Sequence, residues 1–225
     1  MFLMCGRFLL TTPADIIAEA FGLAETVHVD PRYNIAPTQE AAVVRSEGDL
    51  RRLSMLRWGL VPRWSKDIAI GNRMINARSE TVAEKPSFRD AFRKRRCLVP
   101  ASGFYEWQKT TSGKQPMCIE MADSGVFAMA GLWERWEGGQ SPLETFTILT
   151  TEPNELCAPI HNRMPVIVPR HAWGRWLDPA KDASAILCPY SGDMRAFGVS
   201  RRVNNPTNDD PSCLERDEGT LDLGP

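Results

Sequence analysis

Five short apolar segments between residues 96 and 150 constrain the fold of this chain more than any other feature. They cover residues 96–100, 103–107, 116–121, 126–133 and 145–150. Each has the length and the β-branched or aromatic content of a strand, and polar turn residues such as Thr111-Ser112-Gly113-Lys114 separate them. This spacing is typical of an antiparallel sheet that meanders or closes into a barrel.

Short helical segments surround the predicted sheet. The clearest covers residues 12–22, with Thr12 as N-cap, Pro13 at the first helical position and Gly22 as the stop. Further helices are expected near residues 79–83, 87–92, 154–158, 171–177 and 181–186, a hairpin at 41–45 and 50–58, and another strand at 165–168. Without an internal repeat or a change in composition before residue 204, these elements predict one α+β domain over residues 1–204, with a barrel-like, mainly antiparallel sheet flanked by short helices.

The last 21 residues differ from the rest of the chain in charge. Residues 205–225 contain six acidic residues and one arginine, among many Asn, Pro and Gly residues, so we expect a disordered acidic tail. The remaining 204 residues hold 26 basic and 22 acidic residues. This leaves room for a modest basic face, well short of a strongly basic nucleic-acid-binding domain with a pI above ~9.

Composition argues against several protein classes. No apolar run approaches the roughly 18 residues of a membrane-spanning helix, and the start lacks the features of a signal peptide. We therefore expect a cytoplasmic protein without a membrane partner. The six cysteines form no CxxC pair, and the three histidines have no ligand spacing, so neither a disulfide framework nor a metal site is expected.

Cys5 begins the stretch with the most distinctive chemistry, Cys5-Gly6-Arg7. If Met4 is the true start and is removed, Cys5 becomes the first residue. An unperturbed α-amine has a pKa near ~7.7–8.0 and a cysteine thiol one near ~8.5, so both can lose a proton near neutral pH. Such an aminothiol can condense with an aldehyde through an imine and close a thiazolidine ring. The alternative is an ordinary buried cysteine.

Three other stretches contain polar residues that could take part in such chemistry. Asn76 could orient a nucleophile and Arg78 could bind an anion, although Asn76 could also be a helix cap. Glu106 lies among aromatic residues, where desolvation would raise its pKa, but strand alternation also allows a solvent-facing position. His161 is an acid/base candidate by residue type, although a lone histidine is more often structural.

Basic and aromatic residues alternate in two places, around residues 57–66 and along residues 89–96. Arginines can hold phosphates while aromatic rings stack on exposed bases, as in proteins that bind single strands. The second run could equally be the solvated end of a helix. This pattern suggests a nucleic-acid surface without establishing it.

Taken together, these stretches resemble the SRAP family, named for "SOS response-associated peptidase". The resemblance covers most of residues 4–203 and extends over seven motifs in order. They are Met-Cys-Gly-Arg-Phe (4–8), Arg-Tyr-Asn-Ile-Ala-Pro (32–37), Trp-Gly-Leu-Val-Pro (58–62), Ile-Asn-Ala-Arg-Ser-Glu (75–80), Gly-Phe-Tyr-Glu-Trp (103–107), Ile-His-Asn-Arg-Met-Pro (160–165) and Val-Ser-Arg-Arg-Val-Asn (199–204). The family fold is a single α+β domain with a barrel-like antiparallel sheet.

The resemblance implies covalent capture of abasic sites in single-stranded DNA, by a monomer without a metal or organic cofactor. Cys5 would form a thiazolidine with the aldehyde of the ring-opened sugar, and Asn76 would position the Cys5 amine and the sugar. Glu106 would assist ring opening and proton transfer, and His161 would act in imine chemistry and in strand cleavage or reversal. The implied DNA contacts are Arg7, Asn34, Pro37, Trp58, Trp64, Arg78, Trp107 and Arg163.

One departure from the family pattern concerns the start of the chain. Met1-Phe2-Leu3 precede the Met-Cys start, and while they are present Cys5 has no free α-amine. We expect a misplaced start, with autocatalytic cleavage as the other route. Two further functions stay open: a cysteine peptidase using Cys5, His161 and Glu106, and a non-enzymatic module that binds single-stranded DNA.

Overall fold

The computed structural model describes residues 5–25, 28–111, 113–220 and 222–224. The strands are β1 (Phe8–Leu10), β2 (Arg32–Ile35), β3 (Glu40–Glu47), β4 (Leu50–Trp58), β5 (Asn76–Arg78), β6 (Arg96–Ala101), β7 (Gly103–Thr110), β8 (Gly113–Met121), β9 (Phe127–Trp136), β10 (Leu143–Thr151), β11 (Met164–Pro165) and β12 (Met194–Gly198). The helices are α1 (Ala14–Phe21), α2 (Arg89–Lys94) and α3 (Trp173–Leu177), and the 3₁₀ helices are η1 (Ile68–Arg73), η2 (Arg170–Ala172), η3 (Ser184–Ile186), η4 (Arg201–Asn204) and η5 (Pro211–Leu214).

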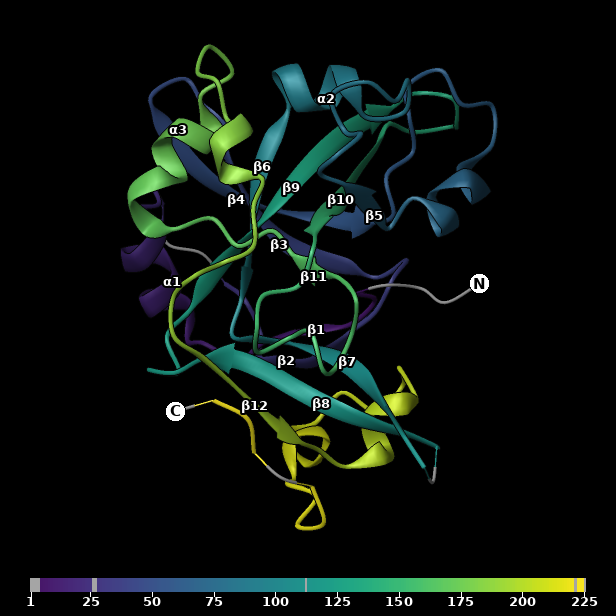
Figure 1. Cartoon of the computed structure of the whole chain (residues 1–225). Coiled ribbons are helices and arrows are strands. Elements are labelled where there is room, and N and C mark those ends of the chain that lie inside the picture. The colour runs from purple at the N-terminus through teal and green to yellow at the C-terminus, as the bar shows by residue number, and fades with distance from the viewer. Residues whose placement is uncertain (1–4, 26–27, 112, 221, 225) are drawn as a thin grey trace.

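Five strands close into a barrel, as Figure 1 shows in its upper half. They follow one another in the order β10, β4, β3, β6 and β9, and β9 pairs back with β10. Every pairing in this ring is antiparallel except that of β4 with β10. Closure leaves these strands without free edges. The predicted α+β fold with a barrel-like, mainly antiparallel sheet is confirmed.

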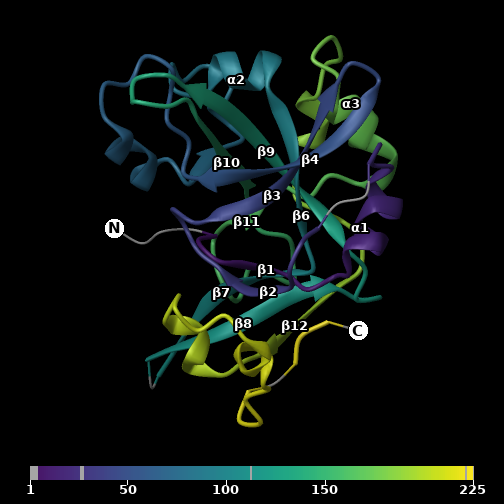
Figure 2. The ribbon, with the colours of Figure 1, turned by 180° about the vertical axis from the view of Figure 1, so that it is seen from behind.

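A second sheet lies against the barrel, with strand order β12-β8-β7-β1-β2. It lies below the barrel in Figure 1, and the view from behind in Figure 2 places α1 beside the junction of the two sheets. The short β5 pairs with β10 on the barrel side. The junction is therefore bordered by β7 from one sheet and by β5 from the other.

The five predicted apolar strands correspond to β6–β10, and the predicted hairpin corresponds to β3 and β4. Gly48 lies in the turn of that hairpin with φ +63°, a conformation that glycine adopts without steric cost. Gly22, with φ +59°, ends α1 as predicted. Thr12 does not cap this helix, because its hydroxyl lies 2.9 Å from the Ser102 hydroxyl, and Pro13 occupies the N-cap position.

Several predicted helices are shorter than expected or absent. Residues 79–83 and 154–158 form hydrogen-bonded turns, and only η3 remains of the helix expected at 181–186. The strand expected at 165–168 is reduced to β11 and an isolated bridge at Ile167. No described helix is long and apolar enough to cross a membrane.

The core fills the barrel and continues to the second sheet. Trp58 is completely buried, with its ring edge-on to Phe8 at 5.2 Å and stacked with Phe146 at 6.1 Å between centroids. Its indole N–H donates to the carbonyl of Ile75 at 2.8 Å. Phe8 belongs to β1 of the second sheet, so this cluster joins the two sheets.

The C-terminal segment packs against the domain, which differs from the disordered tail expected for residues 205–225. Asp209 accepts the N–H groups of Tyr33 and Asn34 at 2.6 and 2.8 Å and pairs with Arg32. Cys213 is fully buried. The acidic composition suggested solvation, but Asp209 instead satisfies backbone donors of β2. The described part of the segment is thus ordered by specific partners.

Candidate active site

The four predicted catalytic residues converge at the junction of the two sheets. Cys5 precedes β1, Asn76 begins β5, Glu106 lies in β7, and His161 lies in the loop between β10 and β11. Asn76 and Glu106 each contact Cys5, and His161 faces Glu106. Residues separated by up to 156 positions are therefore assembled by the pairing of strands.

Cys5 and Glu106 form the shortest contact among these four residues. The Cys5 backbone nitrogen donates to Glu106 Oε1 at 2.6 Å. Their proximity follows from the register of β1 and β7, in which Phe8 pairs with Phe104 and the Tyr105 N–H donates to the Arg7 carbonyl. Glu106 is only 3% exposed. The solvent-facing position that alternation allowed for it is wrong, because both faces of β7 are covered here.

Burial raises the pKa of the Glu106 carboxyl above its ordinary value. The nearby His161 and the hydrogen bonds from Cys5 act in the opposite direction but do not cancel this effect. His161 Nδ1 lies 3.9 Å from Glu106 Oε1, too far for a hydrogen bond. A carboxyl with a raised pKa can exchange a proton with an amine more readily than an ordinary surface carboxylate.

The Cys5 thiol is also buried, and burial together with the neighbouring Glu106 carboxylate raises its pKa well above the ordinary value. The thiol is consequently protonated near neutral pH and is a poor nucleophile by itself. Cys5 has φ +41°, in the left-handed region.

Asn76 approaches Cys5 from the barrel side. Its Nδ2 lies 3.5 Å from the Cys5 carbonyl oxygen. Asn76 pairs with Ile148 in the parallel ladder of β5 and β10, so it begins a strand instead of capping a helix. The amide therefore lies on a rigid element, as a positioning role requires.

His161 is held at the end of a single backbone turn. Its N–H donates to the Cys157 carbonyl at 2.9 Å, and its Nδ1 lies 3.2 Å from the Arg163 backbone nitrogen. Cys157 itself is buried, and burial followed by Glu106 raises the pKa of its thiol to about 12. Sequence reasoning gave Cys157 no role, although its position four residues before His161 could have suggested that it faces the same site.

The predicted DNA-contacting residues fall into two groups. Arg78 and Trp64 are exposed, and Pro37, Arg7 and Trp107 are half-buried. The Arg7 guanidinium lies 5.7 Å from the centre of the Trp107 ring and donates to the Val203 carbonyl at 2.6 Å. Contact between these five residues and DNA stays a prediction.

The second group is turned inward, and contact between its members and DNA also stays a prediction. Trp58 belongs to the core described above. Asn34 is completely buried, and its amide donates to the carbonyls of residues 203, 205 and 208. Arg163 is 9% exposed and pairs with Glu80. In this structure these side chains stabilise the walls of the site instead of facing a ligand.

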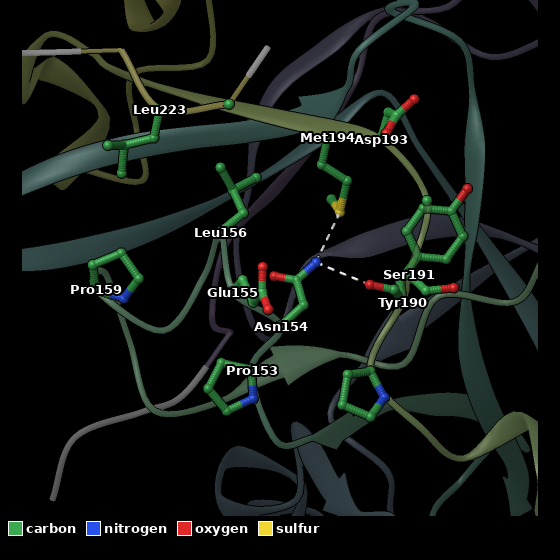
Figure 3. Close-up of a pocket in the computed structure, with 13 residues that line it drawn as sticks. Pro153, Asn154, Glu155, Leu156, Pro159, Tyr190, Ser191, Asp193, Met194 and Leu223 are labelled. Atoms are coloured by element: carbon green, nitrogen blue, oxygen red, sulfur yellow. Dashed lines mark hydrogen bonds between the residues drawn. The ribbon is translucent and has the colours of Figure 1, made fainter.

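A cavity of about 780 Å³ is lined by none of the four residues. Its walls are residues 153–156 with Pro159 on one side and residues 189–194 on the other (Figure 3). Asn154 bridges the two walls by donating to the Tyr190 carbonyl at 3.0 Å. Among the described residues, no group of three His, Cys, Asp or Glu side chains is placed to hold a metal ion.

Comparisons with known proteins show what this chain is similar to. A family model described as "SOS response associated peptidase (SRAP)" matches residues 4–206. The abasic site processing protein YoqW of Bacillus subtilis is 44% identical over 222 residues, covering 94% of this chain and 99% of that protein. The abasic site processing protein HMCES of Gallus gallus is 34% identical over 221 residues, covering 82% and 66% of the two chains.

A solved structure of a protein from Bacteroides thetaiotaomicron has the same fold. It superimposes with a TM-score of 0.85 at 28% identity and covers 95% of this chain and all of the other. The family match extends over nearly all of the barrel, the second sheet and the four converging residues. On these grounds, the chain belongs to the SRAP family.

Proposed function

We propose that this protein processes abasic sites in single-stranded DNA by forming a covalent bond through Cys5. The contact that carries the proposal is the 2.6 Å approach of the Cys5 nitrogen to Glu106 Oε1. In a chain that begins at Cys5, this nitrogen is the α-amine. An amine must lose its extra proton before it attacks an aldehyde, and Glu106 is placed to accept that proton.

The proposed reaction joins the aminothiol to the ring-opened sugar in two steps. The amine adds to the aldehyde carbon, and loss of one water gives an imine. The Cys5 sulfur then adds to the imine carbon while the thiol proton passes to the nitrogen, which closes a thiazolidine ring. The adduct therefore has the mass of protein plus DNA minus one water. The sulfur gains its nucleophilic character as its proton leaves, and this proton is the one that the nitrogen takes up.

Asn76 and His161 would complete the site from the barrel side. The Asn76 amide, 3.5 Å from the Cys5 carbonyl, would hold the cysteine backbone and the sugar. His161, facing Glu106, would serve imine chemistry and, where it occurs, strand cleavage or reversal of the crosslink. Exposed Arg78 and Trp64 would contact a phosphate and a base of the strand.

The two alternative functions receive less support from the geometry. A cysteine peptidase needs a thiolate or a neighbouring base that generates one, whereas burial and Glu106 raise the pKa of the Cys5 thiol. The acid of such a triad contacts the Cys5 nitrogen instead of only orienting His161. A purely electrostatic DNA-binding module would leave the buried Cys5 and Glu106 pair without a function.

The test is incubation of protein that begins at Cys5 with a single-stranded oligonucleotide containing one abasic site. We expect a covalent adduct on a denaturing gel, with intact mass lower by one water than the sum of the reactants. Cys5→Ala should abolish it, while Cys188→Ala, which removes an exposed thiol, should leave it unchanged. Protein that retains residues 1–4 should not react. An adduct that survives Cys5→Ala would refute the proposal.

A further inference from the structure

Glu80 belongs to the 75–80 motif but has no part in the chemistry proposed above. Its carboxylate receives two hydrogen bonds from Arg163, from Nη1 at 2.5 Å and from Nη2 at 3.0 Å. These bonds lower the pKa of Glu80 below its ordinary value. The parallel two-bond geometry is the strongest and most directional form of this ion pair.

The same guanidinium also connects separate elements of the site. Arg163 Nη2 donates to the Thr150 carbonyl of β10 at 2.6 Å, and the Ser79 N–H donates to that carbonyl at 2.9 Å. Glu80 and Asn76 belong to one segment, which β10 holds by pairing with β5. The Glu80–Arg163 pair therefore fixes the loop of His161 relative to the strand that carries Asn76.

Arg163 reaches His161 through its main chain. The Arg163 backbone N–H donates to His161 Nδ1 at 3.2 Å. A nitrogen that accepts this bond cannot carry a proton in the same geometry, so with this bond formed the neutral imidazole would have its proton on Nε2. The Arg163 carbonyl oxygen also lies 3.3 Å from Nδ1 and would favour the opposite tautomer by accepting a proton from Nδ1, so the two backbone groups of Arg163 compete for this nitrogen. The position of the Arg163 backbone thus decides which nitrogen is protonated.

We propose that Glu80 is a positioning residue, which holds Arg163 so that its backbone N–H keeps His161 in the Nε2-protonated tautomer near Glu106. The inference deepens the function proposed above and rests on it for its catalytic meaning. Glu80 does not touch the reacting atoms; it acts only through Arg163. Its ion pair would otherwise be a half-exposed salt bridge, since the Glu80 side chain is 45% exposed, and such pairs contribute little to stability.

The first measurement is two-bond ¹H–¹⁵N NMR of the imidazole rings, with the His161 signals identified by their loss in His161→Ala. We expect unmodified protein to show a single Nε2-protonated form of neutral His161. Glu80→Gln should give a mixture of tautomers. The control is Glu84→Gln, which removes an exposed carboxylate four residues away and should leave the spectrum unchanged. Retention of the single tautomer in Glu80→Gln would overturn the proposal.

The second measurement is the rate of crosslinking to the abasic oligonucleotide. Misplacement of a catalytic group by an ångström can reduce a rate by about 10²-fold, so Glu80→Gln should lower the rate about 10- to 100-fold with little change in DNA affinity. Glu84→Gln should react at the unmodified rate. If Glu80→Gln does not fold, Arg163→Lys, which keeps the charge and loses the paired geometry, should give the same two changes.

The two proposals can fail separately. If unmodified protein forms no crosslink, the proposed function fails, but the tautomer measurement still decides whether Glu80 controls His161. If crosslinking occurs and neither Glu80→Gln nor Arg163→Lys alters the tautomer or the rate, the function stands and the positioning role is refuted.

Discussion

Glu106 and Glu134 are two buried glutamates in two regions of the molecule, the junction of the sheets and the wall of the barrel. They are 3% and 5% exposed, and burial raises the pKa of both carboxyls. Glu134 has a permanent cationic partner, since Arg95 donates to it at 2.7 Å. Glu106 instead receives the Cys5 backbone N–H at 2.6 Å, and His161 Nδ1 lies 3.9 Å from its carboxylate.

The difference between these partners separates a structural carboxylate from the one to which we assign a catalytic role. A guanidinium is not deprotonated in proteins, so it cannot exchange a proton with Glu134. The Arg95–Glu134 pair is therefore a structural ion pair. The partners of Glu106 are a histidine and a nitrogen that becomes titratable when the chain starts at Cys5. Similar burial therefore accompanies a fixed ion pair in the barrel and, in the function proposed above, a proton-exchanging group at the junction.

The sharpest test of this contrast is removal of each charge in turn. Glu106→Gln should lower the crosslinking rate about 10²- to 10⁴-fold, the usual contribution of a general acid or base. Glu134→Gln should leave the rate unchanged and lower the free energy of unfolding by about 1–3 kcal/mol, because Arg95 loses its charged partner. Crosslinking kinetics and urea denaturation measure the two effects. Equal loss of rate in both variants would contradict the distinction.

Trp58 and Trp64 give a second comparison, between a buried aromatic residue and an exposed one. Trp58→Ala should lower the free energy of unfolding by about 3–5 kcal/mol, because it empties the cluster that joins the sheets. Trp64, 59% exposed, should change stability by less than about 0.5 kcal/mol when replaced by alanine. Its loss should weaken binding of single-stranded DNA by about 1–3 kcal/mol if it stacks on a base. Denaturation and fluorescence anisotropy distinguish these outcomes.

The smallest expected effect is the dependence of stability on pH. The folded pKa of Glu106 is raised above the ordinary 4.5, so the folded state binds more protons than the unfolded state between these two values. The free energy of unfolding should therefore fall as pH rises through this window, by at most about 1.4 kcal/mol per pH unit. Glu106→Gln should lose this component. Denaturation curves that respond to pH identically in both proteins would contradict the assignment.

Strand positions were predictable from sequence because period and turn residues are local signals. The hairpin of β3 and β4 and the run from β6 to β10 follow from them. Closure of the barrel was not predictable in detail, since the pairing of β4 with β10 joins residues almost 90 positions apart. The order of residues 205–220 was missed for a related reason. Asp209 is an ordinary acidic residue until β2 presents two N–H groups to it.

Some features of the candidate site were also predictable from sequence, and others were not. Residue type and motif order singled out Cys5, Asn76, Glu106 and His161, and the fold brings them together. No local sequence pattern distinguishes Trp58 from Trp64. Only the structure shows that Trp58 is buried and Trp64 exposed. The pairing of Glu80 with Arg163 was also missed, since it joins residues 83 positions apart in sequence.

The steric cost of the left-handed backbone conformation of Cys5 depends on whether another residue precedes it. A non-glycine residue with φ +41° brings its Cβ close to backbone oxygens, one of which belongs to the preceding residue. The left-handed conformation costs about 1–2 kcal/mol. A chain that starts at Cys5 has no preceding carbonyl and avoids that part of the steric conflict. The left-handed backbone of Cys5 is therefore less costly in a chain that starts at this residue than in one in which another residue precedes it.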